Sequence, residues 1–169
     1  LVFSPLICWA AQGTARIIPQ GSLGILKGGS EVQQIQSEIP VPQGTMFRCH
    51  GRCMIQGQSV QFVAQDQAIL AVTESDQQIA LNVPQGKIDF VLKPGSKYVV
   101  MNTEQGVVEI QEAVFSVNSQ NTVSGSLLVS NGAARMSVGE GILGVMANGQ
   151  RHTIESGKAI KLAQAKIFE

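Results

Sequence analysis

The sequence has few charged residues, and the charges it does have cancel. Among its 169 residues, Lys and Arg together number 12, as do Asp and Glu, so the formal net charge is zero. Charged residues make up 14% of the chain, well below the usual quarter. This composition gives no reason to expect a surface for nucleic acid or for an anionic membrane. Gln, Ser, Asn and Thr carry the polarity instead, a pattern loosely associated with exported bacterial proteins.

Long apolar runs are also missing. No stretch after the first residues reaches the roughly 20 apolar residues that span a bilayer, so no transmembrane segment is expected. Residues 1–11 are apolar and uncharged, and Cys8 and Ala10 are small residues at the −3 and −1 positions of a cut after Ala10. We interpret this segment as the tail of a secretory signal peptide, which predicts a periplasmic or extracellular protein. A buried N-terminal segment is the alternative, and lipidation at Cys8 is disfavoured because Ile7 before it is not small.

Helix signals are scarce, whereas strand and turn signals recur. No window of a dozen residues keeps a helical apolar spacing without an interrupting Gly or Pro. The dipeptides Asn131-Gly132 and Asn148-Gly149 are strong hairpin signals. The sequence therefore predicts an all-β fold of many short antiparallel strands in a meander that is solenoid-like or sandwich-like. The alternating runs expected to face inward contain Val60, Phe62, Ala64, Ile79, Leu81, Val83, Ile88, Phe90, Leu92, Val108 and Ile110.

We divide the chain by composition. Residues 12–40 form a Gly- and Gln-rich segment that should contain one or two strands and a turn at Lys27-Gly28-Gly29. Residues 41–163 form the main all-β domain, and residues 164–169 are a C-terminal tail. "VPQG" occurs at 41–44 and again at 83–86, each time before a strand-like run, which is a weak internal echo.

The order of these strands resembles the FecR-like domain family. The likeness rests on "GKIDFVLKPGSKYVVMNTEQGVVEIQEAVFSVN" (86–118) and on the later motifs Val138-Gly139-Glu140-Gly141-Ile142 and 157–162, and it covers about residues 40–163. One departure is that Glu112-Ala113 stands where the family pattern has Gly-Thr, so we expect a different turn there. The resemblance implies a periplasmic or extracellular domain that works by protein–protein contact and is not an enzyme.

"RCHGRC" (48–53) is the densest group of potentially reactive side chains. Haem attachment needs C-x-x-C-H, which this order does not supply. Zinc needs four ligands, and Cys49, His50 and Cys53 supply three, so a zinc site is a low-probability hypothesis. A redox pair would need C-x-x-C at a helix start. We favour a Cys49–Cys53 disulfide that closes a hairpin around residues 50–52, with free thiols or zinc as the remaining alternatives.

Other catalytic and binding motifs are lacking. The chain has no G-x-S-x-G elbow, and its two histidines, His50 and His152, lie about a hundred residues apart. "GSLGILKGG" lacks the phosphate-binding Gly-Lys-Ser/Thr ending, and Asp66, Asp76 and Asp89 form no calcium loop. We therefore predict neither an enzymatic activity nor a cofactor.

The hypothesis that follows is an exported, non-catalytic β-domain that binds other proteins as a subunit of an envelope or extracellular assembly. Exposed sheet edges and residues 12–40 are the expected contact surfaces. One alternative is a periplasmic sensor module of a sigma-regulator system, which the sequence upstream of Leu1 would distinguish. Another is a small metal-binding or redox protein that uses Cys49, His50 and Cys53.

Overall fold

The computed structural model describes residues 15–117 and 120–162, and this part of the chain forms sixteen β-strands and no helix. The predicted signal-peptide tail (1–11) and the C-terminal tail (164–169) lie outside the described residues. In the described part there is also no apolar helix of membrane-spanning length. The predicted all-β fold class is confirmed.

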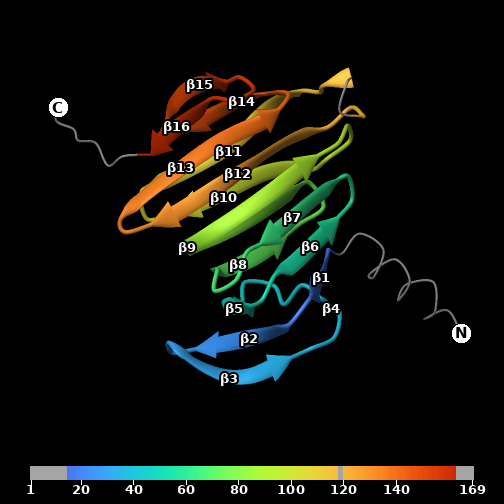
Figure 1. The fold of residues 1–169 in the computed structure, drawn as a ribbon, viewed down its shortest axis with the longest axis vertical. Helices are drawn as coiled ribbons and strands as arrows, with labels where there is room; N and C mark the ends of the chain where they lie inside the picture. The colour runs from blue at the N-terminus through green and yellow to red at the C-terminus, as the bar shows by residue number, and fades with distance from the viewer. Residues whose placement is uncertain (1–14, 118–119, 163–169) are drawn as a thin grey trace, which may run out of the picture.

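The strands form two sheets that share one long strand (Figure 1). In spatial order, the first sheet contains β4 (Ile39–Pro40), β1 (Arg16–Pro19), β6 (Cys53–Gly57), β7 (Val60–Ala64), the C-terminal half of β9 (Gln78–Leu92), β12 (Val123–Ser130), β13 (Ala133–Glu140) and β16 (Ala159–Leu162). The second contains β3 (Ser30–Ile35), β2 (Ser22–Lys27), β5 (Phe47–His50), β8 (Ile69–Glu74), the N-terminal half of β9, β10 (Tyr98–Thr103), β11 (Gly106–Val114), β14 (Ile142–Ala147) and β15 (Gln150–Ile154).

The chain alternates between the sheets as it advances along the long axis. In Figure 1, β2 and β3 lie at one end of the molecule and β14 and β15 at the other. Neighbouring strands pair antiparallel as predicted, except that β9 and β10 pair in parallel. Among the described strands, each sheet has an unpaired edge strand at each end. The edges are β4 and β16 in the first sheet and β3 and β15 in the second.

Strand β9 joins the sheets without a break. Its first half pairs with β8 and β10, and its second half pairs with β7 and β12. The sequence pattern suggested two strands here, divided at the second "VPQG". The strand instead continues through Gly86, whose φ of +119° is a conformation that L side chains rarely adopt. A side chain at Gly86 would also collide with Ala68, because an added Cβ would lie 2.5 Å from the Ala68 Cβ.

The two sheets enclose a single apolar core. Every residue that the alternating pattern placed inward is buried there, including Phe62, Leu81 and Phe90. Ala15, Ile17 and Leu23 belong to the same core, so the N-terminal strands pack as part of one body with the rest. The two Asn-Gly pairs join β12 to β13 and β14 to β15, and all four residues have positive φ angles.

Candidate functional site

The hairpin predicted for "RCHGRC" is wrong. Strand β5, which ends at His50, pairs with β2 and β8 in the second sheet. Strand β6, which begins at Cys53, pairs with β1 and β7 in the first sheet. Residues 50–52 are therefore a corner between sheets, where Gly51 has a φ of +85° and its N–H donates to Asp66 Oδ1 at 2.8 Å.

Cys49 and Cys53 both lie fully buried in the core, on opposite sheets. Their thiols are not bridged in this structure. A hydrogen bond with the Cys53 thiol, followed by burial, strongly raises the pKa of the Cys49 thiol. A thiol held protonated in this way is a poor nucleophile, which weighs against the redox alternative. The disulfide stays a prediction, but it would join the two sheets across the core rather than clamp a hairpin.

The three hypothetical zinc ligands do not converge, because successive residues of a strand point to opposite faces. Cys49 points into the core, whereas His50 lies on the outer face, with its Nε2 2.5 Å from Glu31 Oε2. His50 Nδ1 faces the Gln67 amide at 3.4 Å. Across residues 15–117 and 120–162, no group of three or more His, Cys, Asp or Glu side chains could hold a metal ion.

The polar cluster around His50 depends on a glycine. An added Cβ at Gly24 would lie 2.4 Å from the Glu31 side-chain Cδ, so Gly24 allows the Glu31 carboxylate to lie across β2. That carboxylate reaches His50 and, at 3.4 Å, Arg48 Nη1. The hydrogen bond from His50 holds the pKa of Glu31 below its usual value. No described Ser, Thr or Cys hydrogen-bonds to His50, so the cluster lacks a nucleophile and acts as a tie between β3 and β5.

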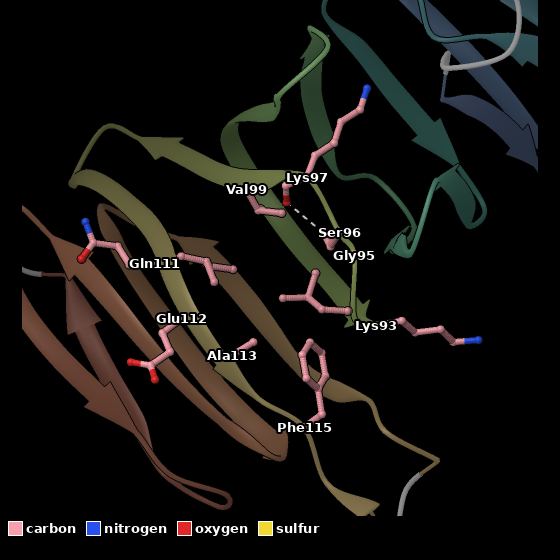
Figure 2. A pocket seen from close by; sticks show the side chains of 11 residues that line it. Lys93, Gly95, Ser96, Lys97, Val99, Gln111, Glu112, Ala113 and Phe115 are labelled. Carbon is pink, nitrogen blue, oxygen red and sulfur yellow. Dashed lines mark hydrogen bonds between the residues drawn. The ribbon is translucent and has the colours of Figure 1, made fainter.

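A hollow of about 230 Å³ lies between the β9–β10 connection and the C-terminal half of β11 (Figure 2). Its apolar lining residues are Leu92, Val99, Ile110, Ala113 and Phe115, and its polar and charged ones are Lys93, Ser96, Lys97, Gln111 and Glu112. In the structure Phe115 lines the hollow, and Val114 is 49% exposed.

The hollow exists because β10 is shorter than β11. The two strands pair from Thr103–Gly106 only as far as Val99–Ile110. Beyond Ile110, β11 continues to Val114 and pairs on its other side with β14. No described strand pairs with residues 111–114 on the β10 side. A short length of sheet edge therefore lies open in the middle of the molecule, beside the apolar lining.

This open edge coincides with the departure from the FecR-like pattern. A turn was expected at Glu112-Ala113. The expectation is wrong, because both residues belong to β11, with a bulge between Ile110 and Glu112. Bulges occur often at sheet edges and re-aim the side chains beside them. The sequence signal for this site was the run "AVFSV", which places apolar residues on both strand faces where a half-buried strand should alternate.

Three charged residues, Lys93, Lys97 and Glu112, also line the hollow. In Figure 2 the side-chain ends of Lys93 and Lys97 point outward, and the Glu112 carboxylate lies on the far side of β11 from Phe115. Lys97 Nζ is held 2.8 Å from Glu74 Oε2 and 2.8 Å from the Ser75 carbonyl. Val117, two residues past Phe115, is 83% exposed. The site is therefore a recess lined by apolar side chains together with Lys93, Lys97 and Glu112, with an exposed apolar residue beside it.

Comparison with known proteins places this chain in no family. No family model, no curated protein and no solved structure matches it.

Proposed function

We propose that the chain is a non-catalytic β-domain that binds a partner protein, and that an extended segment of the partner docks beside β11. The observation that carries this proposal is the open edge at residues 111–114 directly beside the hollow. An unpaired edge offers backbone N–H and C=O groups to an added strand, and a neighbouring pocket takes one of its side chains.

The size of the hollow favours a side chain over a small-molecule ligand. Its volume of about 230 Å³ is smaller than the roughly 300–1,000 Å³ of pockets that enclose drug-sized ligands. Lys93 and Lys97 also line it, but their side-chain ends point outward and do not converge on a substrate. The exposed Val114 and Val117 would extend the apolar contact to neighbouring residues of the partner.

The export and assembly parts of the proposal rest on the sequence. Residues 1–11 have the character of a signal-peptide tail, and the strand order resembles the FecR-like family, which implies a periplasmic or extracellular protein-binding domain. Fractionation of cells expressing the gene, with N-terminal sequencing of the mature protein, tests this part. Export predicts a new N-terminus after Ala10. A protein that stays in the cytoplasm with residues 1–10 intact would overturn it.

The docking site is tested with a charge placed in the hollow. Wild-type protein is used to capture a partner from envelope and culture-supernatant fractions, and the purified partner is then titrated against variants. We expect Ala113→Glu to weaken binding at least tenfold, because its carboxylate would be desolvated beside the apolar side chains of the recess. Val32→Glu is the matched control, because Val32 is 59% exposed on β3, far from the hollow along the sheet order.

Circular dichroism and urea unfolding establish that both variants are folded. If Ala113→Glu binds as tightly as wild type while Val32→Glu does not, the contact edge is β3, within the Gly- and Gln-rich segment, and the β11 site is refuted. A protein that captures no partner refutes the binding function itself.

A further inference from the structure

The outer face of the first sheet carries a row of side chains that only the strand register brings together. Lys87 on β9 pairs with Leu128 on β12, which pairs with Arg135 on β13, which pairs with Lys161 on β16. Directly opposed residues of an antiparallel sheet project from the same face. Strands lie about 4.8 Å apart, so the four side chains cross roughly 14 Å of the sheet. The row contains three cations and one apolar residue.

Two of these cations form no ion pair with a residue that the structure describes. Lys87 Nζ lies 3.9 Å from Asp89 Oδ1, which partly offsets its charge. Neither Arg135 nor Lys161 forms an ion pair with any described residue, although both are exposed. Lys158, on the connection that leads into β16, is a further exposed cation nearby, and it forms no ion pair within residues 15–117 and 120–162. The row is therefore locally positive in a chain whose net charge is zero.

The surface is hollowed on both sides of Arg135. One hollow, of about 440 Å³, is lined by small residues that include Ser126, Ser137 and Gly125, by the cations Arg135 and Lys158, and by Asp89. The second, of about 230 Å³, is bounded by Leu128, Ala133, Arg135 and Lys161. Leu128 is 44% exposed at the centre of the row.

We infer that this face binds an acidic extended segment of a partner protein, with its carboxylates over Arg135 and Lys161 and an apolar side chain against Leu128. Charge complementarity identifies the acidic character of the segment. The exposed Leu128 between cations favours a polypeptide over a phosphate or a sulfated glycan, because neither of those brings an apolar group to meet it. Phe90, the aromatic residue in the lining of the larger hollow, is 1% exposed, so it offers a sugar ring no stacking platform.

This inference rests on the proposed function only in taking the ligand to be a protein. Its residues lie apart from the β11 hollow. The two proposals fail separately. A synthetic peptide of alternating Glu and Leu is titrated against the full chain at low and high salt, beside its Gln-for-Glu version. Heparin and inorganic phosphate serve as anions without an apolar group. None of these probes tests docking at the β11 hollow, which is read from Ala113→Glu and the captured partner.

We expect the Glu peptide to bind, with affinity that falls as salt rises, and the Gln peptide to bind much more weakly. Arg135→Gln and Lys161→Gln should each weaken binding roughly threefold to fivefold, as expected for exposed ion pairs. Leu128→Ser should weaken it by a similar factor. Lys27→Gln, an exposed cation on the other sheet without an ion pair, is the control and should leave binding unchanged.

Three results would overturn the inference. Equal effects of Lys27→Gln and Arg135→Gln would show attraction to charge in general. Binding of heparin that exceeds that of the Glu peptide and is insensitive to Leu128→Ser would assign the face to a glycan. Absence of Glu-peptide binding at low salt would remove the site altogether.

Discussion

Replacing Gly86 with Ala should destabilise this protein more than an alanine at any of its exposed turn glycines. Gly86 is the point at which β9 passes from one sheet to the other, so it links the two halves of the core. Its φ of +119° lies outside the regions that Ala adopts easily. An Ala Cβ there would also lie 2.5 Å from the Ala68 Cβ and 2.6 Å from the Ala68 Cα.

The cost has two parts. A non-glycine residue in such a backbone conformation costs about 1–3 kcal/mol. Carbon atoms pack at about 3.5–4.0 Å, so Ala68 would have to move by about 1 Å. Ala68 is fully buried, and its backbone is fixed by hydrogen bonds from its N–H to the Gln65 carbonyl and from the Cys49 N–H to its carbonyl. Overpacking a core in this way costs about 1–3 kcal/mol, so the total is about 2–6 kcal/mol.

The matched control is Gly132→Ala. Gly132 also has a positive φ, of +75°, but an added Cβ there meets no atom within 4 Å. Only the backbone cost of about 1 kcal/mol applies to it. Urea unfolding followed by far-ultraviolet circular dichroism measures both values by linear extrapolation. Domains of this size have a free energy of unfolding of about 5–15 kcal/mol. The loss caused by Gly86→Ala is therefore measurable and is a large part of that total.

The reasoning is refuted if the two variants lower the free energy of unfolding by the same amount, to within about 0.5 kcal/mol. The strand would then tolerate its backbone conformation at this position without glycine, and the contact with Ala68 would carry no cost. Adding Ala68→Gly to Gly86→Ala gives a further check. It removes the Cβ contact but leaves the one to the Cα, so a partial recovery relative to Ala68→Gly alone is expected.

Three further predictions concern side chains that the fold brings together. Asn148→Gly keeps the turn but removes hydrogen bonds to the Gln105 carbonyl and from the Val107 N–H, so it should cost about 1–2 kcal/mol in urea unfolding, against much less for Asn131→Gly. The pKa of Glu31 is lowered in the folded protein, so its carboxylate stabilises the fold above the usual pKa of 4.5, and this stabilisation is lost as pH falls through the lower folded value. Glu31→Gln should therefore reduce the loss of stability on the acid side of a stability–pH profile. Intact mass with and without reductant should show a difference of two hydrogens if Cys49 and Cys53 are bridged in the exported protein, and no difference would refute the disulfide.

The candidate site shows where sequence reasoning stops. Alternation identified the inward residues of β9 and β11 correctly, because burial of one sheet face imposes a period of two on the chain. The resemblance to the FecR-like family led us to expect a turn at Glu112-Ala113, where the strand in fact continues through a bulge. Whether a strand ends or bulges depends on its neighbours. Here β14 pairs with residues 112–114 while β10 stops at Val99, and neither fact is local to the sequence.

The "RCHGRC" segment also shows that local sequence does not determine which strands pair. Two cysteines that flank three residues are compatible with a hairpin and equally compatible with a corner between two sheets. The choice was made by strands distant in sequence: β2 and β8 pair with β5, while β1 and β7 pair with β6. The inward period of two still holds, so Cys49 and Cys53 are buried and His50 lies outside.

By itself the sequence determined the fold class, the inward-facing residues and the positions of the Asn-Gly turns. These depend on alternation and on local backbone preferences, which neighbouring residues set. Only the tertiary structure decided which strands pair, that β9 is one strand through Gly86, and that an edge of β11 lies open beside a hollow. It also assembled Lys87, Leu128, Arg135 and Lys161 into one row. Pairing between distant strands is a property of the whole sheet, because register is selected by the simultaneous burial of every strand's apolar face.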